Sequence, residues 1–175
     1  DMLSEQAAKF RPSRVVVANP QSRDAFEVFR AEMASMGIKA SCGDEAIADA
    51  MADDDTDVVV TATVGYSGLI PTIRAIRAGK TIALANKETL VVAGDIVTRE
   101  KEIFGVDIIP VDSEHSAIYQ CLHGEDRNTV ERLWITASGG PFRCVEPSRL
   151  AGMKAADALR HPNWSMGAKI TVDSA

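Results

Sequence analysis

Residues 1–110 alternate short runs of β-branched residues with segments of helical length, and this alternation limits the fold more than any other feature. Within the helical segments, apolar residues recur three or four positions apart. Such a pattern predicts βαβ units with parallel strands and right-handed crossovers. The continuous apolar character of the runs predicts strands that are covered on both faces. The expected strands are Arg14–Ala18, Asp57–Thr61, Thr81–Ala85 and Val106–Val111, and the expected helices are Ser22–Met36, Asp44–Met51, Leu69–Arg77 and Glu88–Glu102.

The pattern changes after Val111. We expect a strand at Leu133–Thr136, a short helix at Pro147–Met153 and a polar, aromatic loop from His161 to Trp164. The run Ile170–Ala175 again has the composition of a strand. We therefore predict an α/β nucleotide-binding domain at residues 1–110 and an α+β catalytic domain at residues 111–175.

Composition argues against several classes of protein. The net charge is −6, and no concentrated basic face is visible, which argues against nucleic acid as a partner. No apolar stretch approaches the ~20 residues that a membrane helix needs, so no membrane association is expected. The three cysteines lie far apart and form no disulfide framework, which favours a reducing cytoplasm.

Polar residues directly follow the apolar run Ile108–Val111, at Asp112, Glu114 and His115. In extended geometry Asp112 and Glu114 would point to the same side, and two hard oxygen donors suit Mg²⁺ or Mn²⁺. The alternative is a helix N-terminus, with Asp112 or Ser113 as the N-cap. The pattern alone favours the helix N-terminus, whereas the position at the carboxyl end of a strand, where open α/β sheets bind ligands, supports the metal site.

A second polar cluster, Asn86-Lys87-Glu88, follows the predicted strand Thr81–Ala85. Asn86 could cap a helix, or Lys87 could reach into a crevice as a cation for an anionic or carbonyl-bearing ligand. Because two clusters follow consecutive strands, a shared crevice is favoured over coincidence. The turn Gly65-Tyr66-Ser67-Gly68 is weak support for phosphate binding, and a tight βα connection is slightly favoured, although these residues could still line a cofactor groove.

Two further segments could contact a ligand. Ser138 stands beside Gly139 and Gly140, where backbone N–H groups can approach an anion, although a structural turn explains the pattern equally well. Trp164 could belong to a core, or it could cover a small ligand from a loop in which His161 donates a hydrogen bond.

Four segments taken together closely resemble the 1-deoxy-D-xylulose 5-phosphate reductoisomerase family. They are Leu84–Val91 (LANKETLV), Pro110–Ile118 (PVDSEHSAI), Thr136–Arg143 (TASGGPFR) and His161–Ile170 (HPNWSMGAKI). They occur in the family's order with similar spacing across residues 57–175, whereas the first 50 residues match only in general pattern. The resemblance implies an N-terminally truncated Rossmann-like NADPH-binding domain, followed by a C-terminally truncated catalytic domain.

The resemblance implies a two-stage reaction at one site. The carbon skeleton of the substrate is rearranged to an aldehyde, which NADPH reduces to 2-C-methyl-D-erythritol 4-phosphate with the help of Mn²⁺, Mg²⁺ or Co²⁺. It also implies a homodimer in the bacterial cytoplasm, or in a plastid if the source is a photosynthetic eukaryote. Carried over by position, the resemblance implies catalytic roles for Lys87, Glu114 and His161 and metal binding by Asp112 and Glu114. The implied substrate contacts are Lys87, Ser113, Glu114, Ser138, His161, Trp164 and Ser174. The implied cofactor contacts are Asn86, Glu88 and Gly167.

The sequence also departs from the family pattern. No Gly-rich pyrophosphate-binding turn precedes Arg14–Ala18, and the family's third acidic metal ligand falls beyond Ala175. We therefore expect the chain to be an internal piece of a longer enzyme and to be inactive alone.

Two other functions remain open from the residues alone. A metal-independent NAD(P)-dependent dehydrogenase would explain the first half but not Asp112, Glu114 or the Trp164 loop. A non-catalytic ligand-binding or oligomerisation module would tolerate alanine at Lys87 or His161.

Overall fold

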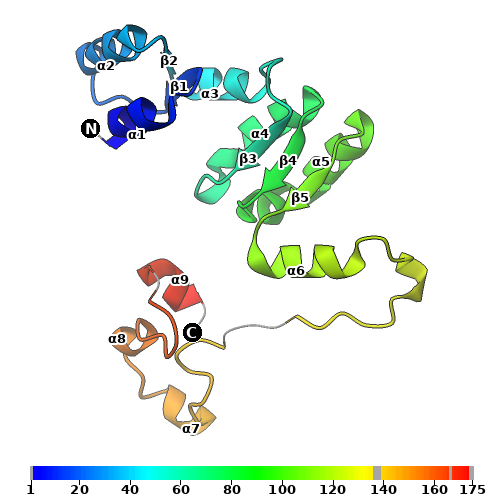
Figure 1. Cartoon of the computed structure of the whole chain (residues 1–175). Helices are drawn as coiled ribbons and strands as arrows, with labels where there is room; N and C mark the ends of the chain where they lie inside the picture. The colour runs from blue at the N-terminus through cyan, green and yellow to red at the C-terminus, as the bar shows by residue number, and fades with distance from the viewer. Residues whose placement is uncertain (1, 136–138, 166, 174–175) are drawn as a thin grey trace. The chain divides into compact units, whose positions relative to one another are not determined.

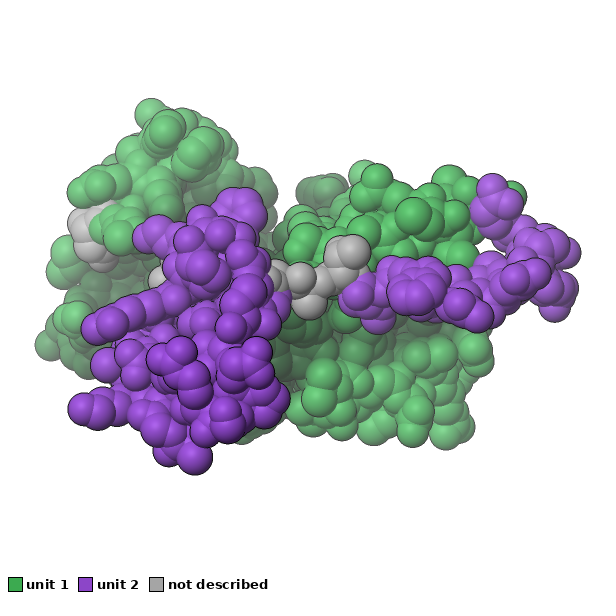
Figure 2. Space-filling model, turned by 90° about the horizontal axis from the view of Figure 1, so that it is seen from below, with its two compact units in different colours: residues 1–124 green, residues 125–175 purple. Residues whose placement is uncertain are grey.

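A computed structural model describes residues 2–135, 139–165 and 167–173. The chain divides into two compact units, residues 1–124 and residues 125–175, which Figure 2 shows in different colours. All predicted elements of the first 110 residues belong to the first unit, and each unit is described by itself below.

The first unit begins with a small parallel pair of strands. These are β1 (Arg14–Val17) and β2 (Lys39–Cys42), and Val15 lies opposite Ala40. The helices α1 (Met2–Phe10) and α2 (Arg23–Ser35) belong to the same part of the unit. The hydroxyl of Ser22 caps α2 by accepting the N–H of Ala25 at 3.1 Å. The core of this part consists of Ala7, Val15, Phe29, Met33 and Ile38.

A second parallel sheet follows, with strand order β3-β4-β5 (Figure 1). Helices and turns alternate with its strands, as the sequence predicts, and the α/β fold class with parallel sheets is confirmed. In chain order the elements are α3 (Asp44–Met51), β3 (Val58–Thr61), the 3₁₀ turn η1 (Gly65–Gly68), α4 (Leu69–Arg77), β4 (Thr81–Leu84), α5 (Glu88–Phe104), β5 (Ile108–Pro110) and α6 (Ser113–Leu122).

One face of the β3-β4-β5 sheet is covered by α4 and α5. Ala75 and Ile76 of α4 and Val97 of α5 are buried in one cluster with Val59, Ile82, Leu84 and Val106. Val59 lies opposite Ile82 in the sheet register, so both side chains lie on the same face. The carboxyl ends of the three strands are therefore held on a packed apolar layer.

The expectation that both faces of these strands would be covered is wrong for the described residues. Val58 and Val60 on the opposite face of β3 are 52% and 62% exposed. The physical reason is the strand order: successive neighbouring strands joined by right-handed crossovers place their helices on one face. In the described part of the chain, α4 and α5 both follow this rule.

The second unit contains only short elements among its described residues. They are the 3₁₀ turn η2 (Arg127–Thr129), α7 (Pro147–Leu150), α8 (Ala155–Ala158) and α9 (Ala168–Asp173). The predicted helix Pro147–Met153 is thus present but shorter. Across the described residues of both units, no helix has the length and apolar character needed to cross a membrane.

Two strand predictions in this unit are wrong. Leu133, Trp134 and Ile135 form no strand and are exposed; Thr136 lies outside the described residues. A strand needs a hydrogen-bonding partner, and none is paired with this segment in the described residues. The predicted strand at Ile170–Ala175 is instead the helix α9 up to Asp173, where Thr171 bonds back to the carbonyl of Gly167.

Two elements of the first unit were not predicted from the sequence. The helix α1 precedes the first predicted strand, and β2 has the sequence Lys-Ala-Ser-Cys, which contains no β-branched residue. β2 forms because β1 offers a parallel partner, so this strand depends on a tertiary contact and not on the local sequence.

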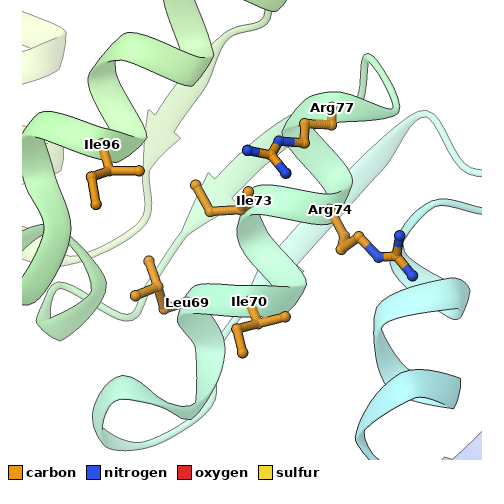
Figure 3. A pocket seen from close by; sticks show the side chains of 6 residues that line it. All are labelled: Leu69, Ile70, Ile73, Arg74, Arg77 and Ile96. Atoms are coloured by element: carbon orange, nitrogen blue, oxygen red, sulfur yellow. The ribbon is translucent and has the colours of Figure 1, made fainter.

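An apolar cleft of about 280 Å³ lies on the outer surface of α4 and α5 (Figure 3). Its two arginines are already paired: Arg74 with Glu45 and Asp49, and Arg77 with Glu100 through two bonds of 2.8 Å. The cleft therefore offers no unpaired cation to an anionic ligand. It is lined by Leu69, Ile70, Ile73, Arg74, Arg77 and Ile96, none of which was a predicted site residue.

We predict that Ile76→Ala lowers the free energy of unfolding of this chain by about 2–5 kcal/mol, because Ile76 is fully buried and alanine leaves a cavity. Ile70→Ala is the matched control, since Ile70 lies in the same helix and is 71% exposed. Ile70→Ala should change the free energy of unfolding by less than about 0.5 kcal/mol. Urea denaturation measures both, and equal effects would contradict the assigned core.

Candidate active site

The candidate site lies where β4 and β5 end side by side. Leu84 and Pro110 lie opposite each other in the parallel register, so the residues that follow them emerge at the same edge of the sheet. Lys87 follows β4 and Asp112 follows β5, and the Nζ of Lys87 lies 3.2 Å from Oδ2 of Asp112. The structure therefore brings the two predicted polar clusters into contact.

Asp112 is the N-cap of α6. Its Oδ1 accepts the backbone N–H of His115 at 3.3 Å, while Oδ2 accepts from Lys87. The Asp112 side chain is only 13% exposed, whereas that of Lys87 is 53% exposed. The capping interpretation is thus realised, and it uses only one of the two carboxylate oxygens.

The surroundings of Asp112 favour its charged form. Burial alone raises the pKa of Asp112, but the N–H of His115 and the hydrogen bond and charge of Lys87 lower it by more. The net result is a pKa below the ordinary value of aspartate. Asp112 in turn raises the pKa of Lys87, chiefly through their hydrogen bond, and the charges of Glu114 and Glu88 add to the effect. Both groups are therefore ionised near neutral pH.

The extended geometry expected for Asp112–Glu114 is wrong. The helix α6 begins at Ser113, so Glu114 lies in its first turn, and residues two apart in a helix do not face each other. The hydroxyl of Ser113 donates to Oε2 of Glu114 at 3.1 Å. Within the ranges that the structure describes, no three His, Cys, Asp or Glu side chains are grouped to hold a metal ion.

Asn86 is the most fully bonded of the predicted site residues. Its Oδ1 accepts the N–H of Thr89 at 3.1 Å and the hydroxyl of Thr89 at 3.3 Å. Its Nδ2 donates to the carbonyl oxygens of Thr63 and Gly65, the latter at 2.8 Å. Asn86 is 2% exposed and thus links the start of α5 to the loop after β3. Its neighbour Glu88 is the first residue of α5.

Gly68 makes a close approach to the same cluster. A Cβ at this position would lie 2.4 Å from the hydroxyl of Thr63 and 3.2 Å from Nδ2 of Asn86. Neither Thr63 nor Thr89 was singled out from the sequence. An asparagine three residues before Thr89 can cap a helix there, which could have identified Thr89. Thr63 contributes its backbone carbonyl and also its hydroxyl, which accepts from Nδ2 of Asn86 at 3.3 Å.

The remaining predicted residues lie apart from this cluster in the chain. His161, Trp164 and Gly167 belong to the second unit, and Ser138 and Ser174 lie outside the described residues. Nδ1 of His161 accepts the backbone N–H groups of Asn163 at 3.2 Å and Trp164 at 3.0 Å. This pattern assigns the proton of the neutral imidazole to Nε2. The side chain of Trp164 is exposed.

Two family models match the chain in succession. The model described as 1-deoxy-D-xylulose 5-phosphate reductoisomerase matches residues 1–94, and the model of the C-terminal domain of the same enzyme matches residues 108–175. Proteins named 1-deoxy-D-xylulose 5-phosphate reductoisomerase from Geobacillus sp. and Porphyromonas gingivalis are 55% and 54% identical over all 175 residues. The chain spans only 45% and 44% of the length of these two relatives.

Solved structures are similar to the chain over nearly its whole length. The 1-deoxy-D-xylulose 5-phosphate reductoisomerase from Zymomonas mobilis in complex with NADPH is 38% identical, with a TM-score of 0.86, and is matched over 100% of this chain and 44% of that one. A DOX-P reductoisomerase in complex with NADPH, fosmidomycin and magnesium is also 38% identical, with a TM-score of 0.80, over 98% of this chain and 44% of that one.

We predict that Asp112→Ala lowers the free energy of unfolding by about 1 kcal/mol more than Asp112→Asn does. Alanine removes the cap of α6, whereas asparagine caps a helix as well as aspartate does. Both variants lose the ion pair with Lys87, so this loss cancels in the comparison. Chemical denaturation of the two variants measures the difference, and equal stabilities would show that the cap contributes nothing.

We further predict that Lys87→Gln raises the pKa of Asp112. With Lys87 present, the low folded-state pKa gives a stabilisation that is complete above the unfolded pKa of about 3.9 and is lost as the pH falls through the folded value. Removing the cation brings the folded-state pKa of Asp112 closer to the unfolded value, so this stabilisation becomes smaller. A carboxyl NMR titration of the wild-type and variant chains gives both pKa values, and an unchanged pKa in the variant would disprove the contact.

Proposed function

Because the chain belongs to the 1-deoxy-D-xylulose 5-phosphate reductoisomerase family, we propose that the protein containing it converts 1-deoxy-D-xylulose 5-phosphate to 2-C-methyl-D-erythritol 4-phosphate with NADPH and a divalent metal. This reaction belongs to non-mevalonate isoprenoid biosynthesis. The observation that carries the proposal is the Lys87–Asp112 pair at the carboxyl ends of adjacent parallel strands. Ligands of open α/β sheets bind at this edge.

The residues at this edge suit a hard divalent cation. Asp112 is a partly buried carboxylate that already has a cation, the ammonium group of Lys87, beside one of its oxygens. Glu114 adds a second, exposed carboxylate on the first turn of the same helix. Asp112 and Glu114 would hold the ion, and the structure of a relative was determined in complex with magnesium. When bound, the metal polarises the substrate carbonyl and neutralises the charge that develops on its oxygen.

The other residues at this edge bind and orient the substrate. The ammonium group of Lys87 is largely exposed and stays protonated, since its pKa is raised, so it can donate hydrogen bonds to an oxygen of the substrate. The hydroxyl of Ser113 lies beside Glu114 at the start of α6, where it can also contact the substrate. A substrate at this edge would thus meet the ammonium group of Lys87, the hydroxyl of Ser113 and the carboxylate of Glu114.

Residues of the second unit also carry proposed roles, which rest on their positions in the family pattern. His161, whose Nδ1 accepts the N–H groups of Asn163 and Trp164, is proposed to contact the substrate, and the exposed Trp164 is proposed to cover it and exclude water. We assign substrate contacts also to Ser138 and Ser174, and cofactor contacts to Asn86, Glu88 and Gly167. NADPH supplies the hydride of the reduction step.

The finer assignments are part of the same proposal. The relatives support magnesium, and Mn²⁺ or Co²⁺ are proposed as alternative ions at the same carboxylates. A homodimer is proposed for the whole protein. A location in the bacterial cytoplasm is proposed because the similar proteins from Geobacillus sp. and Porphyromonas gingivalis are bacterial.

We predict that Glu114→Gln lowers the magnesium-dependent turnover of the whole protein by at least about a hundredfold, because a metal ligand contributes several kcal/mol of charge stabilisation. Loss of NADPH absorbance with 1-deoxy-D-xylulose 5-phosphate measures the rate. The matched control is Glu102→Gln, an exposed glutamate on α5, which should retain the wild-type rate. Absence of turnover in the wild-type protein would refute the proposed reaction, and normal turnover in Glu114→Gln would refute the metal assignment alone.

A further inference from the structure

Asn86 has no hydrogen-bonding capacity left for a ligand. An asparagine side chain has two N–H donors and two acceptor lone pairs on its oxygen. The two donors are used by the carbonyl oxygens of Thr63 and Gly65, and the oxygen accepts twice from Thr89. The residue is 2% exposed. A cofactor could bond to this amide only by displacing a bond that already exists.

The bonds of Asn86 join two separate connections of the sheet. Thr63 and Gly65 lie in the loop between β3 and α4, and Thr89 lies in the first turn of α5 after β4. Gly68, at the end of the same loop, packs so closely on Thr63 and Asn86 that a Cβ would have to displace them. The backbone N–H of Asn86 also donates to the carbonyl of Thr61, at the end of β3.

We infer that Asn86 is a positioning residue: its side-chain amide fixes the Thr63–Gly68 loop at the carboxyl end of β3, and this loop, not the amide, shapes the cofactor groove. The first part rests on the bonds described above. The second part rests on the proposed function, because it takes NADPH as the ligand at this edge of the sheet. The loop presents exposed side chains there, including Val64 and Tyr66.

We call the hydrogen bonds from Asn86 to the carbonyl oxygens of Thr63 and Gly65 the clamp. The first experiment distinguishes this clamp from an ordinary helix cap. Asn86→Asp keeps the oxygen that caps α5, because aspartate is as good an N-cap as asparagine. It loses both donors and places a carboxylate against the carbonyl oxygens of Thr63 and Gly65. Amide hydrogen exchange in the whole protein without NADPH should therefore become at least about tenfold faster in residues 63–68 and stay unchanged at the start of α5.

Unchanged exchange in residues 63–68 of Asn86→Asp would overturn the clamp, because a mere cap predicts that outcome. Faster exchange at the start of α5 alone would overturn it as well. Neither result depends on whether the protein binds NADPH, so this experiment stands even if the proposed reaction is wrong.

The second experiment asks how Asn86 influences the cofactor. NADPH affinity of the whole protein is measured by fluorescence for the wild type, Asn86→Ala, Gly68→Ala and the double variant. Each single change should weaken binding by roughly tenfold, and the double variant should be no weaker than the worse single variant, since both act through one loop. Effects that multiply would overturn the inference, because they would show that Asn86 and Gly68 influence NADPH binding through separate structural changes and not through one loop. Wild-type protein that binds no NADPH would refute the proposed function and the groove-shaping role with it, while the exchange result would still decide the clamp.

Discussion

The parallel register of β4 and β5 determines the arrangement of the candidate site. Leu84 and Pro110 end their strands opposite each other, so the chain leaves the sheet twice at the same edge. Each exit is followed by a helix whose first residues are polar. Lys87 and Asp112 meet because of this register, although 25 positions separate them in the sequence. The apolar layer formed by α4 and α5 beneath the sheet keeps the two exits in place.

The same polar residues serve both the helices and the site. Asp112 caps α6 through one oxygen and pairs with Lys87 through the other, and Asn86 caps α5 while holding the loop after β3. A helix start supplies N–H donors, and residues that satisfy them also stand at the edge of the sheet where ligands bind. The capping role of Asp112 therefore does not exclude its proposed role in binding a ligand.

The sequence predicts the parts of this arrangement that depend on local pattern. The strands Val58–Thr61 and Thr81–Leu84 and their helices follow from β-branched runs and helical spacing, and the proximity of Lys87 and Asp112 follows from consecutive parallel strands. The sequence does not predict β2, which depends on its partner strand. It leaves open whether Glu114 lies in an extended segment or in the first turn of a helix capped by Asp112, and the structure shows the helix. It also overpredicts strand at Leu133–Ile135, where apolar residues have no pairing partner among the described residues.

The saturated amide of Asn86 also affects how motion is distributed at this edge. Its hydrogen bonds to Thr63, Gly65 and Thr89 join the loop after β3 to the first turn of α5, so the backbone next to Lys87 is anchored. The lysine side chain, in contrast, is a flexible four-carbon stem whose tip is largely in solvent. The backbone at this edge is thus anchored, while the ammonium group of Lys87 can move. Its reorientation needs only changes of side-chain torsion angles, which are far faster than rearrangement of a loop.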